Sequence, residues 1–247
     1  MLRILKINRS TYYKWHHFKP SAYELTTQHL KQVIKTLHAD IPIYGAPRLT
    51  MWLQKLGYGV SQRSVWRIMH NLSIKAAVGH VNQKPRTKVI YPQRPNLVKN
   101  HPERPYWSAD ITYIQLVDGR WVYLSSVYDP IKRHVVGFAV DKRMTKEFVN
   151  RSFGRALSCT GRPQYLHSDM GSQYTSDLFE SSLRRHQMQH SYSLKGYPYD
   201  NEGIESFHAT IKRELIYLNQ YQTLREVIIS VENYIYWFNT SRISLVG

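Results

Sequence analysis

The spacing of apolar residues changes along the 247-residue chain and predicts two regions of different structure. In the first region apolar side chains recur at helical intervals, which predicts a helix over Leu25–His38. Two shorter helices follow over Pro47–Leu56 and Ser61–Leu72, and the turn Gly57-Tyr58-Gly59 separates them. The pattern therefore predicts an all-α region over residues 1–75.

The second of these short helices has one apolar stripe and a largely basic outer face. Two short helices about a glycine turn are typical of a helix-turn-helix, which places one helix in the major groove of DNA. A helical hairpin that packs against another part of the protein and contacts no DNA is the alternative interpretation. The residues that we expect to contact DNA in this region are Arg48, Arg63 and Arg67.

Residues 76–105 show little apolar periodicity and are rich in basic side chains and proline. This composition predicts an extended basic linker, which either lies along DNA or acts as a solvated tether. The prolines are Pro85, Pro92, Pro95, Pro102 and Pro105.

From Trp107 the apolar period becomes two, and the dipeptide Asp118-Gly119 indicates a hairpin. Three antiparallel strands, followed by alternating helices and short strands, predict an α/β domain over 106–247 with a mixed five-stranded sheet and flanking helices. The later strands are expected at Pro163–His167 and Gln189–Ser191, and the helices at Thr145–Leu157, Ser176–Arg185, Asn201–Leu215 and Leu224–Phe238.

Three carboxylates occupy distinctive positions in this α/β domain. Asp110 interrupts a strand with a buried pattern, Asp169 follows the fourth strand, and Glu205 lies about one turn into a helix. A bare carboxylate in a buried strand costs several kcal/mol unless it is paired or binds a metal. Mg²⁺ prefers oxygen ligands, and two such ions roughly 3.5–4 Å apart stabilise both the attacking and the leaving oxygen of a phosphoryl transfer. The three acids therefore predict a two-metal site.

Basic residues follow the third carboxylate on its helix. His208 and Lys212 come three and seven residues after Glu205, on the same face, and Arg213 lies beside that face. We expect these side chains and Lys195 to hold DNA beside the metals, although an ordinary solvated charged face explains His208 and Arg213 equally well. Glu202, one turn before Glu205, is the competing acid.

The net charge of +17 and the sequence pI of about 9.9 indicate a polyanionic partner. No uncharged apolar run is long enough to span a membrane, and no apolar signal-peptide core is found at the N-terminus. DNA is therefore favoured over a membrane. Cys159 is the single cysteine, which excludes intrachain disulfides and cysteine-based zinc clusters and fits a cytoplasmic protein.

The segments Trp107–Ile114, His167–Thr175 and Tyr197–Glu214 resemble the catalytic segments of orfB-type insertion-sequence transposases. These enzymes belong to the superfamily of DDE transposases and retroviral integrases. Arg9–Trp15 and Tyr44–Arg48 resemble the N-terminal region of the same family. The match covers nearly the whole chain and includes the 35-residue interval between the second aspartate and the glutamate.

The resemblance implies an RNase H-like core in which Asp110, Asp169 and Glu205 hold two Mg²⁺ or Mn²⁺ ions. The implied reactions of this nucleoid-associated bacterial enzyme are DNA 3′-end cleavage and strand transfer of an insertion sequence. Lys212 would contact DNA at the element end. The implied partners are element ends, target DNA, further copies of the chain and a fusion partner from an upstream frame.

The resemblance also leaves other interpretations open. The chain stops at Gly247, and Ser244 stands where a histidine is expected, so we expect a C-terminal truncation. A non-catalytic DNA-binding remnant of a truncated transposase is therefore an alternative. An RNase H-type nuclease that acts on RNA–DNA hybrids is the third interpretation.

Overall fold

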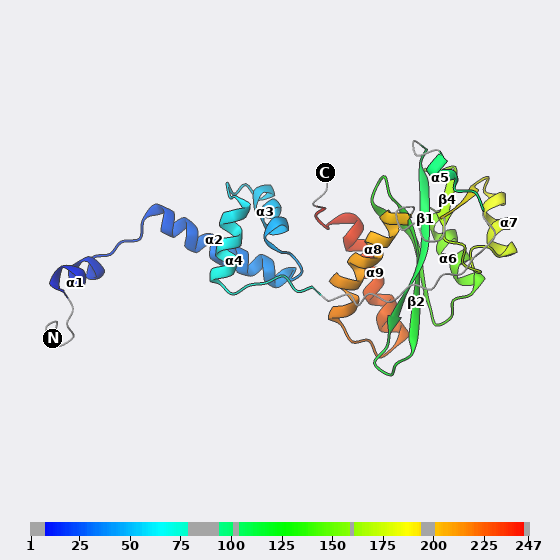
Figure 1. Cartoon of the computed structure of the whole chain (residues 1–247). Helices are drawn as coiled ribbons and strands as arrows, with labels where there is room; N and C mark the ends of the chain where they lie inside the picture. Colours follow the sequence, from blue (N-terminus) through cyan, green and yellow to red (C-terminus); the bar gives the residue numbers. More distant parts are fainter. Residues whose placement is uncertain (1–7, 79–93, 101–103, 159–160, 194–200, 245–247) are drawn as a thin grey trace. The chain divides into compact units, whose positions relative to one another are not determined.

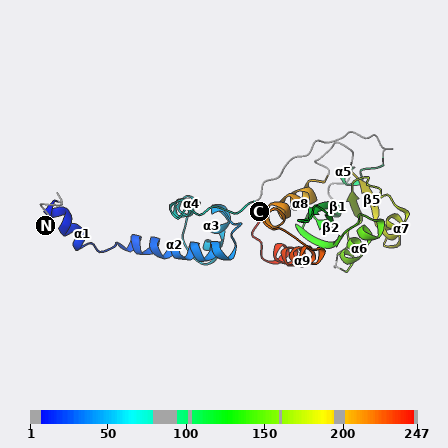
Figure 2. The same cartoon turned by 90° about the horizontal axis from the view of Figure 1, so that it is seen from below.

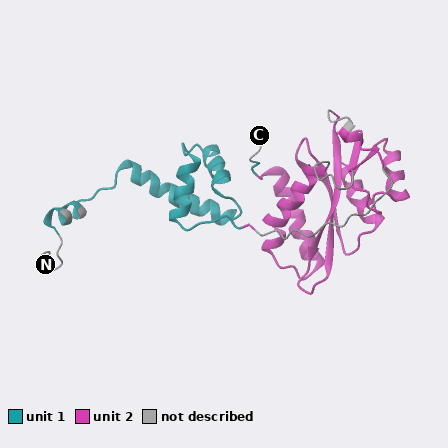
Figure 3. Ribbon diagram, in the orientation of Figure 1, with its two compact units in different colours: residues 1–77, 243–247 teal, residues 78–242 magenta. Residues whose placement is uncertain are grey.

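The computed structural model describes residues 8–78, 94–100, 104–158, 161–193 and 201–244. The chain divides into two compact units, which Figure 3 shows in different colours. The first unit comprises residues 1–77 with 243–247, and the second comprises residues 78–242.

The first unit is helical in its described part, as the apolar spacing predicts. Its longest helix begins with a capping box, in which the side chains of Ser21 and Glu24 bond to each other's backbone N–H groups. The turn between the last two helices contains Gly57, whose φ of 88° is a conformation that glycine adopts without strain. The helices are α1 (Arg9–His16), α2 (Ala22–Asp40), α3 (Ala46–Lys55) and α4 (Gln62–Asn71).

One apolar face of each of α2, α3 and α4 forms the core of this unit. Ile34 on α2, Leu49 and Leu53 on α3, and Val65 on α4 are completely buried. The remaining face of α4 is exposed and carries Arg63, Trp66 and Arg67. The predicted all-α, helix-turn-helix-like region is confirmed.

The second unit contains a five-stranded mixed sheet, as predicted, and its strands lie in the order β3-β2-β1-β4-β5. Figure 1 labels β1, β2 and β4 of this sheet. The first three strands are antiparallel neighbours, and the last two run parallel to β1. The strands are β1 (Tyr106–Gln115), β2 (Trp121–Asp129), β3 (His134–Asp141), β4 (Tyr165–Ser168) and β5 (Gln189–Tyr192).

Helices cover both faces of the sheet (Figures 1 and 2). One layer contains α8 (Glu202–Glu214) and α9 (Leu224–Thr240), joined through the 3-10 helix η2 (Ile216–Leu218). The other layer contains α6 (Lys146–Ala156) and α7 (Asp177–Arg185). Alternate side chains of the strands enter two separate apolar cores, because successive residues of a strand point to opposite faces. No helix among the described residues is both long enough and apolar enough to cross a bilayer.

A short α5 (Leu97–Asn100) lies beside the outer strand of the sheet. The backbone N–H of Tyr192 donates to the carbonyl of Pro95 at 3.0 Å, and that of Val98 donates to the hydroxyl of Ser191 at 3.1 Å. Residues 94–100 therefore cover part of the β5 edge, which satisfies backbone groups that an exposed edge strand leaves unpaired.

The pairing of β1 creates the setting of the candidate site. On one side β1 pairs with β2 from Ser108 to Gln115, but on the other side it pairs with β4 only from Tyr106 to Ala109. Asp110 is the next residue of β1, at the point where β4 ends.

Candidate active site

Asp110 lies on the central strand and faces the layer that contains α8. Its Oδ1 accepts a hydrogen bond from the backbone N–H of Ile111 at 2.8 Å. Its Oδ2 lies 3.2 Å from Nδ1 of His208 on α8, and the carboxylate side chain is 27% exposed. Asp110 is therefore held in place on one side and accessible on the other.

His208 has a different environment from the DNA-facing one that we expected. The residue is buried, at 5% exposure, and its Nε2 lies 3.1 Å from the hydroxyl of Ser126 on β2. The tautomer with the proton on Nδ1 satisfies both contacts, because it donates to Asp110 and accepts from Ser126. His208 therefore contacts a carboxylate inside the protein. Its position four residues after the buried Ile204 is the sequence signal for this burial.

Asp169 directly follows β4, on the neighbouring strand. Its Oδ1 accepts a hydrogen bond from the backbone N–H of Gly171 at 3.0 Å. The pKa of the carboxyl is raised, chiefly because the surrounding protein partly desolvates it and also because of the charge of Asp110, while the bond from Gly171 opposes the rise. The strand register explains this influence, because Ala109 pairs with Ser168 and the two aspartates are the residues that follow this pair.

A buried tyrosine lies close to both aspartates. Tyr174 is 2% exposed, and its phenol lies beside the hydroxyl of Ser125, which opposes the rise in pKa that follows from burial. Burial, and then the negative charges of Asp110 and Asp169, raise the pKa of the phenol well above its ordinary value. Two carboxylates and a hydroxyl in this arrangement are hard oxygen donors of the kind that a divalent cation prefers, and a cation would relieve the repulsion between the carboxylates.

Glu205 is exposed on α8, one turn before His208. Because His208 contacts Asp110, this helix carries the glutamate toward the same part of the sheet. The described residues nevertheless contain no group of three or more acidic, histidine or cysteine side chains that could hold a metal ion. The structure thus places Asp110 and Asp169 one residue beyond the last β1–β4 pair, Ala109 and Ser168, and Glu205 on the helix that contacts Asp110. Glu202 is also exposed, and its charge contributes to the raised pKa of Tyr106, after burial.

The basic residues after Glu205 lie at the surface of α8. The ammonium of Lys212 lies 4.6 Å from the centre of the Tyr113 ring on β1. Arg213 is exposed, and its Nε donates to the carbonyl of Ala209 at 3.2 Å. Both side chains are accessible to a phosphate. Lys195 lies outside the described residues.

The arginines predicted in the helical unit fall into two groups. Arg63 and Arg67 are exposed on α4 and separated by about one turn, so they can reach the same DNA backbone. Arg48 is half-buried, and its guanidinium lies 5.5 Å from the centre of the Tyr44 ring.

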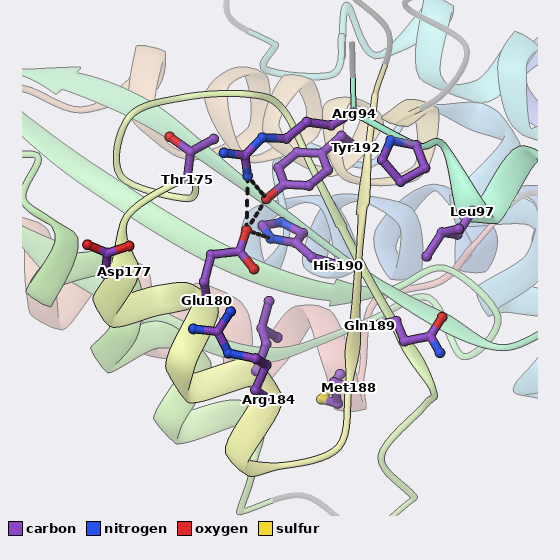
Figure 4. Close-up of a pocket in the computed structure, with 12 residues that line it drawn as sticks. Arg94, Leu97, Thr175, Asp177, Glu180, Arg184, Met188, Gln189, His190 and Tyr192 are labelled. Carbon is purple, nitrogen blue, oxygen red and sulfur yellow. Dashed lines mark hydrogen bonds and ion pairs between the residues drawn. The ribbon is translucent and has the colours of Figure 1, made fainter. Parts of the chain in front are cut away.

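A polar cluster that the sequence pattern did not predict joins α7, β5 and Arg94 (Figure 4). Oε1 of Glu180 accepts from Arg94 at 3.1 Å and lies 3.0 Å from Nδ1 of His190, and Tyr192 also donates to it. The hydrogen bond with His190, followed by those with the other partners, lowers the pKa of Glu180 to about 2. Nε2 of His190 lies 2.9 Å from the hydroxyl of Ser168, which precedes Asp169.

Comparisons with known proteins agree with this architecture. The model of an integrase core domain matches residues 101–198, and a second integrase core domain model matches residues 186–243. The model of an HTH-like domain matches residues 26–80. These matches cover both units of the chain.

Relatives of known name resemble the chain over most of its length. The transposase for insertion sequence element IS904 of Lactococcus lactis subsp. lactis (strain IL1403) is 34% identical, over 92% of this chain and 92% of the relative. The transposase InsF for insertion sequence IS3A of Escherichia coli (strain K12) is 29% identical, over 95% of this chain and 85% of the relative. The catalytic core domain of BIV integrase is 17% identical, with a TM-score of 0.45, over 57% of this chain and 88% of that one.

The HTH-like and integrase core domain matches, together with the named relatives, define the class of the chain as a DNA transposase or integrase. Within that class, the chain belongs to the family of insertion-sequence transposases.

Proposed function

We propose that Asp110, Asp169 and Glu205 form the catalytic centre of this transposase and hold two Mg²⁺ or Mn²⁺ ions. The observation that supports this assignment is the register of β1 and β4, whose last pair, Ala109 and Ser168, is followed by Asp110 on one strand and Asp169 after the other. Glu205 is the third ligand, because its helix is attached to Asp110 through His208. Rotation of its exposed side chain brings the third carboxylate to the aspartates when the ions bind.

The reaction is cleavage at a DNA 3′ end followed by transfer of the freed strand to a second phosphodiester. Asp110, Asp169 and Glu205 would hold the two divalent ions, which when bound would supply Lewis-acid activation of the attacking water or 3′-hydroxyl and stabilisation of the leaving oxygen. The protein contributes the position of the carboxylates: Ile111 and His208 fix Asp110, and Gly171 fixes Asp169. Groups that orient metal ligands in this way raise metal affinity and activity.

DNA contacts come from both units. Residues 1–75 are the DNA-contacting helical region and residues 106–247 are the catalytic core. The basic linker is residues 76–105, of which residues 94–100 pack against β5. Because strand transfer joins two DNA ends, the active form is a multimer of this chain on DNA, and an upstream-frame fusion partner supplies recognition of the terminal repeats. The basic residues that contact DNA are Arg48, Arg63, Arg67, Lys195, Lys212 and Arg213.

Strand transfer on labelled element-end DNA with Mg²⁺ or Mn²⁺ tests the catalytic assignment. The wild type should yield joined product, and Glu205→Gln should reduce the product by at least about 10³-fold, because the substitution removes a ligand charge at the reacting centre. Glu202→Gln is the matched control, since it makes the same chemical change one turn earlier on α8 and should retain activity.

The outcomes separate the interpretations. If Glu205→Gln remained active and Glu202→Gln did not, the third carboxylate would be Glu202. If wild-type protein bound the DNA without forming product, even with its multimer and fusion partner supplied, the catalytic assignment would fail and the chain would be a DNA-binding remnant.

A further inference from the structure

Three partly exposed aromatic side chains gather near the hairpin end of β1. Tyr113 on β1 and Trp121 on β2 are each 40% exposed, and Tyr217 on η2 is 44% exposed. Single exposed aromatic residues are common and need no explanation. Here residues from three elements share one place, so we call Tyr113, Trp121 and Tyr217 the aromatic platform.

The geometry of the platform is well defined. The rings of Tyr113 and Trp121 lie 5.3 Å apart between centres and are perpendicular, which is a preferred arrangement of aromatic pairs. The strand register explains this contact, since Tyr113 opposes Tyr123 and Gln115 opposes Trp121, so that the two rings are diagonal neighbours on one face. Tyr217 lies near this end of β1, because Tyr221, four residues later, forms a β-bridge with Leu116 and its carbonyl accepts from the N–H of Val117.

A positive charge lies directly on the platform. The ammonium of Lys212 approaches the Tyr113 ring to 4.6 Å, a cation–π contact. Lysine has a long, flexible side chain with three donors, so its ammonium can leave the ring for a phosphate oxygen. The ring face of Tyr113 would then be available to another flat group.

Aromatic faces beside a basic side chain are what unpaired nucleotides require. Bases stack on aromatic rings irrespective of sequence, while the phosphates bind the cation. A paired duplex keeps its base faces inside its own stack and cannot use such a platform. The overall charge of +17 favours this polyanion over an apolar protein partner.

The platform lies within reach of the proposed catalytic carboxylates. Tyr113 comes three residues after Asp110 on β1, a distance of about 10 Å along a strand. This length corresponds to about three stacked nucleotides. Asp110 and Tyr113 point to opposite faces of β1, but in the described residues no strand pairs with the β4 side of β1 between Asp110 and Gln115. A single strand that crosses this open edge can reach both faces.

We propose that Tyr113, Trp121 and Tyr217, with Lys212, bind unpaired nucleotides of a DNA end whose phosphodiester lies at the carboxylates. This inference rests on the proposed function, because it places the single-stranded segment of the same DNA substrate. The platform stacks the bases, and Lys212 moves from the Tyr113 ring to a phosphate of the bound strand. Binding to the platform thereby stabilises the unpaired state of the nucleotides at the DNA end.

Binding to two DNA probes tests the proposal with the full-length chain. One probe is a fully paired duplex, and the other is the same duplex with its last nucleotides left as a single-stranded 3′ overhang. Fluorescence anisotropy without catalytic metal measures affinity, and 2-aminopurine in the overhang reports stacking. Wild type should prefer the overhang probe, and its binding should quench 2-aminopurine.

Substitutions of platform residues then test whether the platform causes the preference for the overhang probe. Tyr113→Ala and Trp121→Ala should each weaken overhang binding about tenfold with little change for the paired duplex, because a stacking contact is lost. Tyr113→Phe should bind as wild type, since it retains the ring. Tyr236→Ala is the matched control: Tyr236 is 72% exposed on α9 and should leave both affinities unchanged.

Equal affinity of the wild type for both probes would overturn the platform. An unchanged preference for the overhang probe in both alanine variants, with native thermal melting, would also overturn it. Either result would leave the catalytic assignment intact. Absence of DNA binding by the wild type would instead overturn the proposed function together with this inference. Loss of strand transfer in Glu205→Gln with an unaltered overhang preference supports both assignments.

Discussion

At the scale of single residues, Glu180 is an acid whose surroundings move its pKa far from the ordinary value. It accepts hydrogen bonds from Arg94 and Tyr192 and bonds to His190, and its pKa is lowered from 4.5 to about 2. A carboxyl with a lowered pKa in the folded state stabilises the fold when ionised. This stabilisation is fully present above pH 4.5 and is lost as the pH falls toward 2.

We therefore expect Glu180→Gln to lower the free energy of unfolding at pH 7 by about 2 kcal/mol, because the charge-assisted bonds are lost. The difference from wild type should shrink as the pH falls from 4.5 toward 2. Urea denaturation across this pH range measures it. Glu232→Gln, an exposed residue of α9, is the control and should change stability by less than about 0.5 kcal/mol. A difference that does not depend on pH would contradict the ionic explanation.

At the scale of elements, the contact between β3 and α6 depends on a glycine. A Cβ built on Gly137 would lie 2.3 Å from the carbonyl oxygen of Ser152 and 2.5 Å from the backbone nitrogen of Ala156. Both atoms belong to the backbone of α6, so a side-chain rotation cannot relieve the overlap. The strand and the helix can approach this closely only without a side chain at position 137.

Gly137→Ala should therefore destabilise the protein by about 1–3 kcal/mol through overpacking. Gly154→Ala makes the same change within α6, where a Cβ meets nothing within 4 Å. That control should stabilise the helix by up to about 1 kcal/mol, because alanine favours helix over glycine. In thermal or urea unfolding, the free energy of unfolding should fall in Gly137→Ala and rise in Gly154→Ala. Changes of the same sign in both variants would contradict the packing argument.

The elements were more predictable than the contacts between them. The apolar periods predicted α2, α3 and α4 and the antiparallel strands, because a period of 3.6 or 2 reports a buried face. The sequence motifs around Asp110 and Asp169 predicted that these two residues belong to one site. Burial of His208 and the cluster around Glu180 were not predicted, since both depend on which strands become neighbours. Arg94 and Tyr192 meet only because β5 joins the parallel side of the sheet and residues 94–100 cover it.

At the scale of the whole molecule, the excess of 34 basic over 17 acidic residues governs association with DNA. Binding releases cations condensed on the phosphates, so affinity falls as salt concentration rises. The effect does not depend on how the two units are arranged.

The logarithm of the DNA association constant should fall linearly with the logarithm of salt concentration, with a slope of about −0.9 per phosphate contacted. Arg63→Ala and Arg67→Ala should each reduce the magnitude of the slope by about 1, if each arginine contacts one phosphate. Anisotropy titrations at several salt concentrations measure these slopes. Glu232→Gln should leave the slope unchanged, and a flat profile for the wild type would contradict the electrostatic account.

The parallel pairing of β1 with β4 also determines when the site can form. The β1–β2–β3 meander closes short loops, whereas Tyr106 must find Tyr165 far along the chain, and such long-range pairing is slow to form during folding. Asp110 and Asp169 meet only through this pairing. A nascent or partly folded chain that contains only the finished hairpins therefore lacks the carboxylate pair of the proposed catalytic centre.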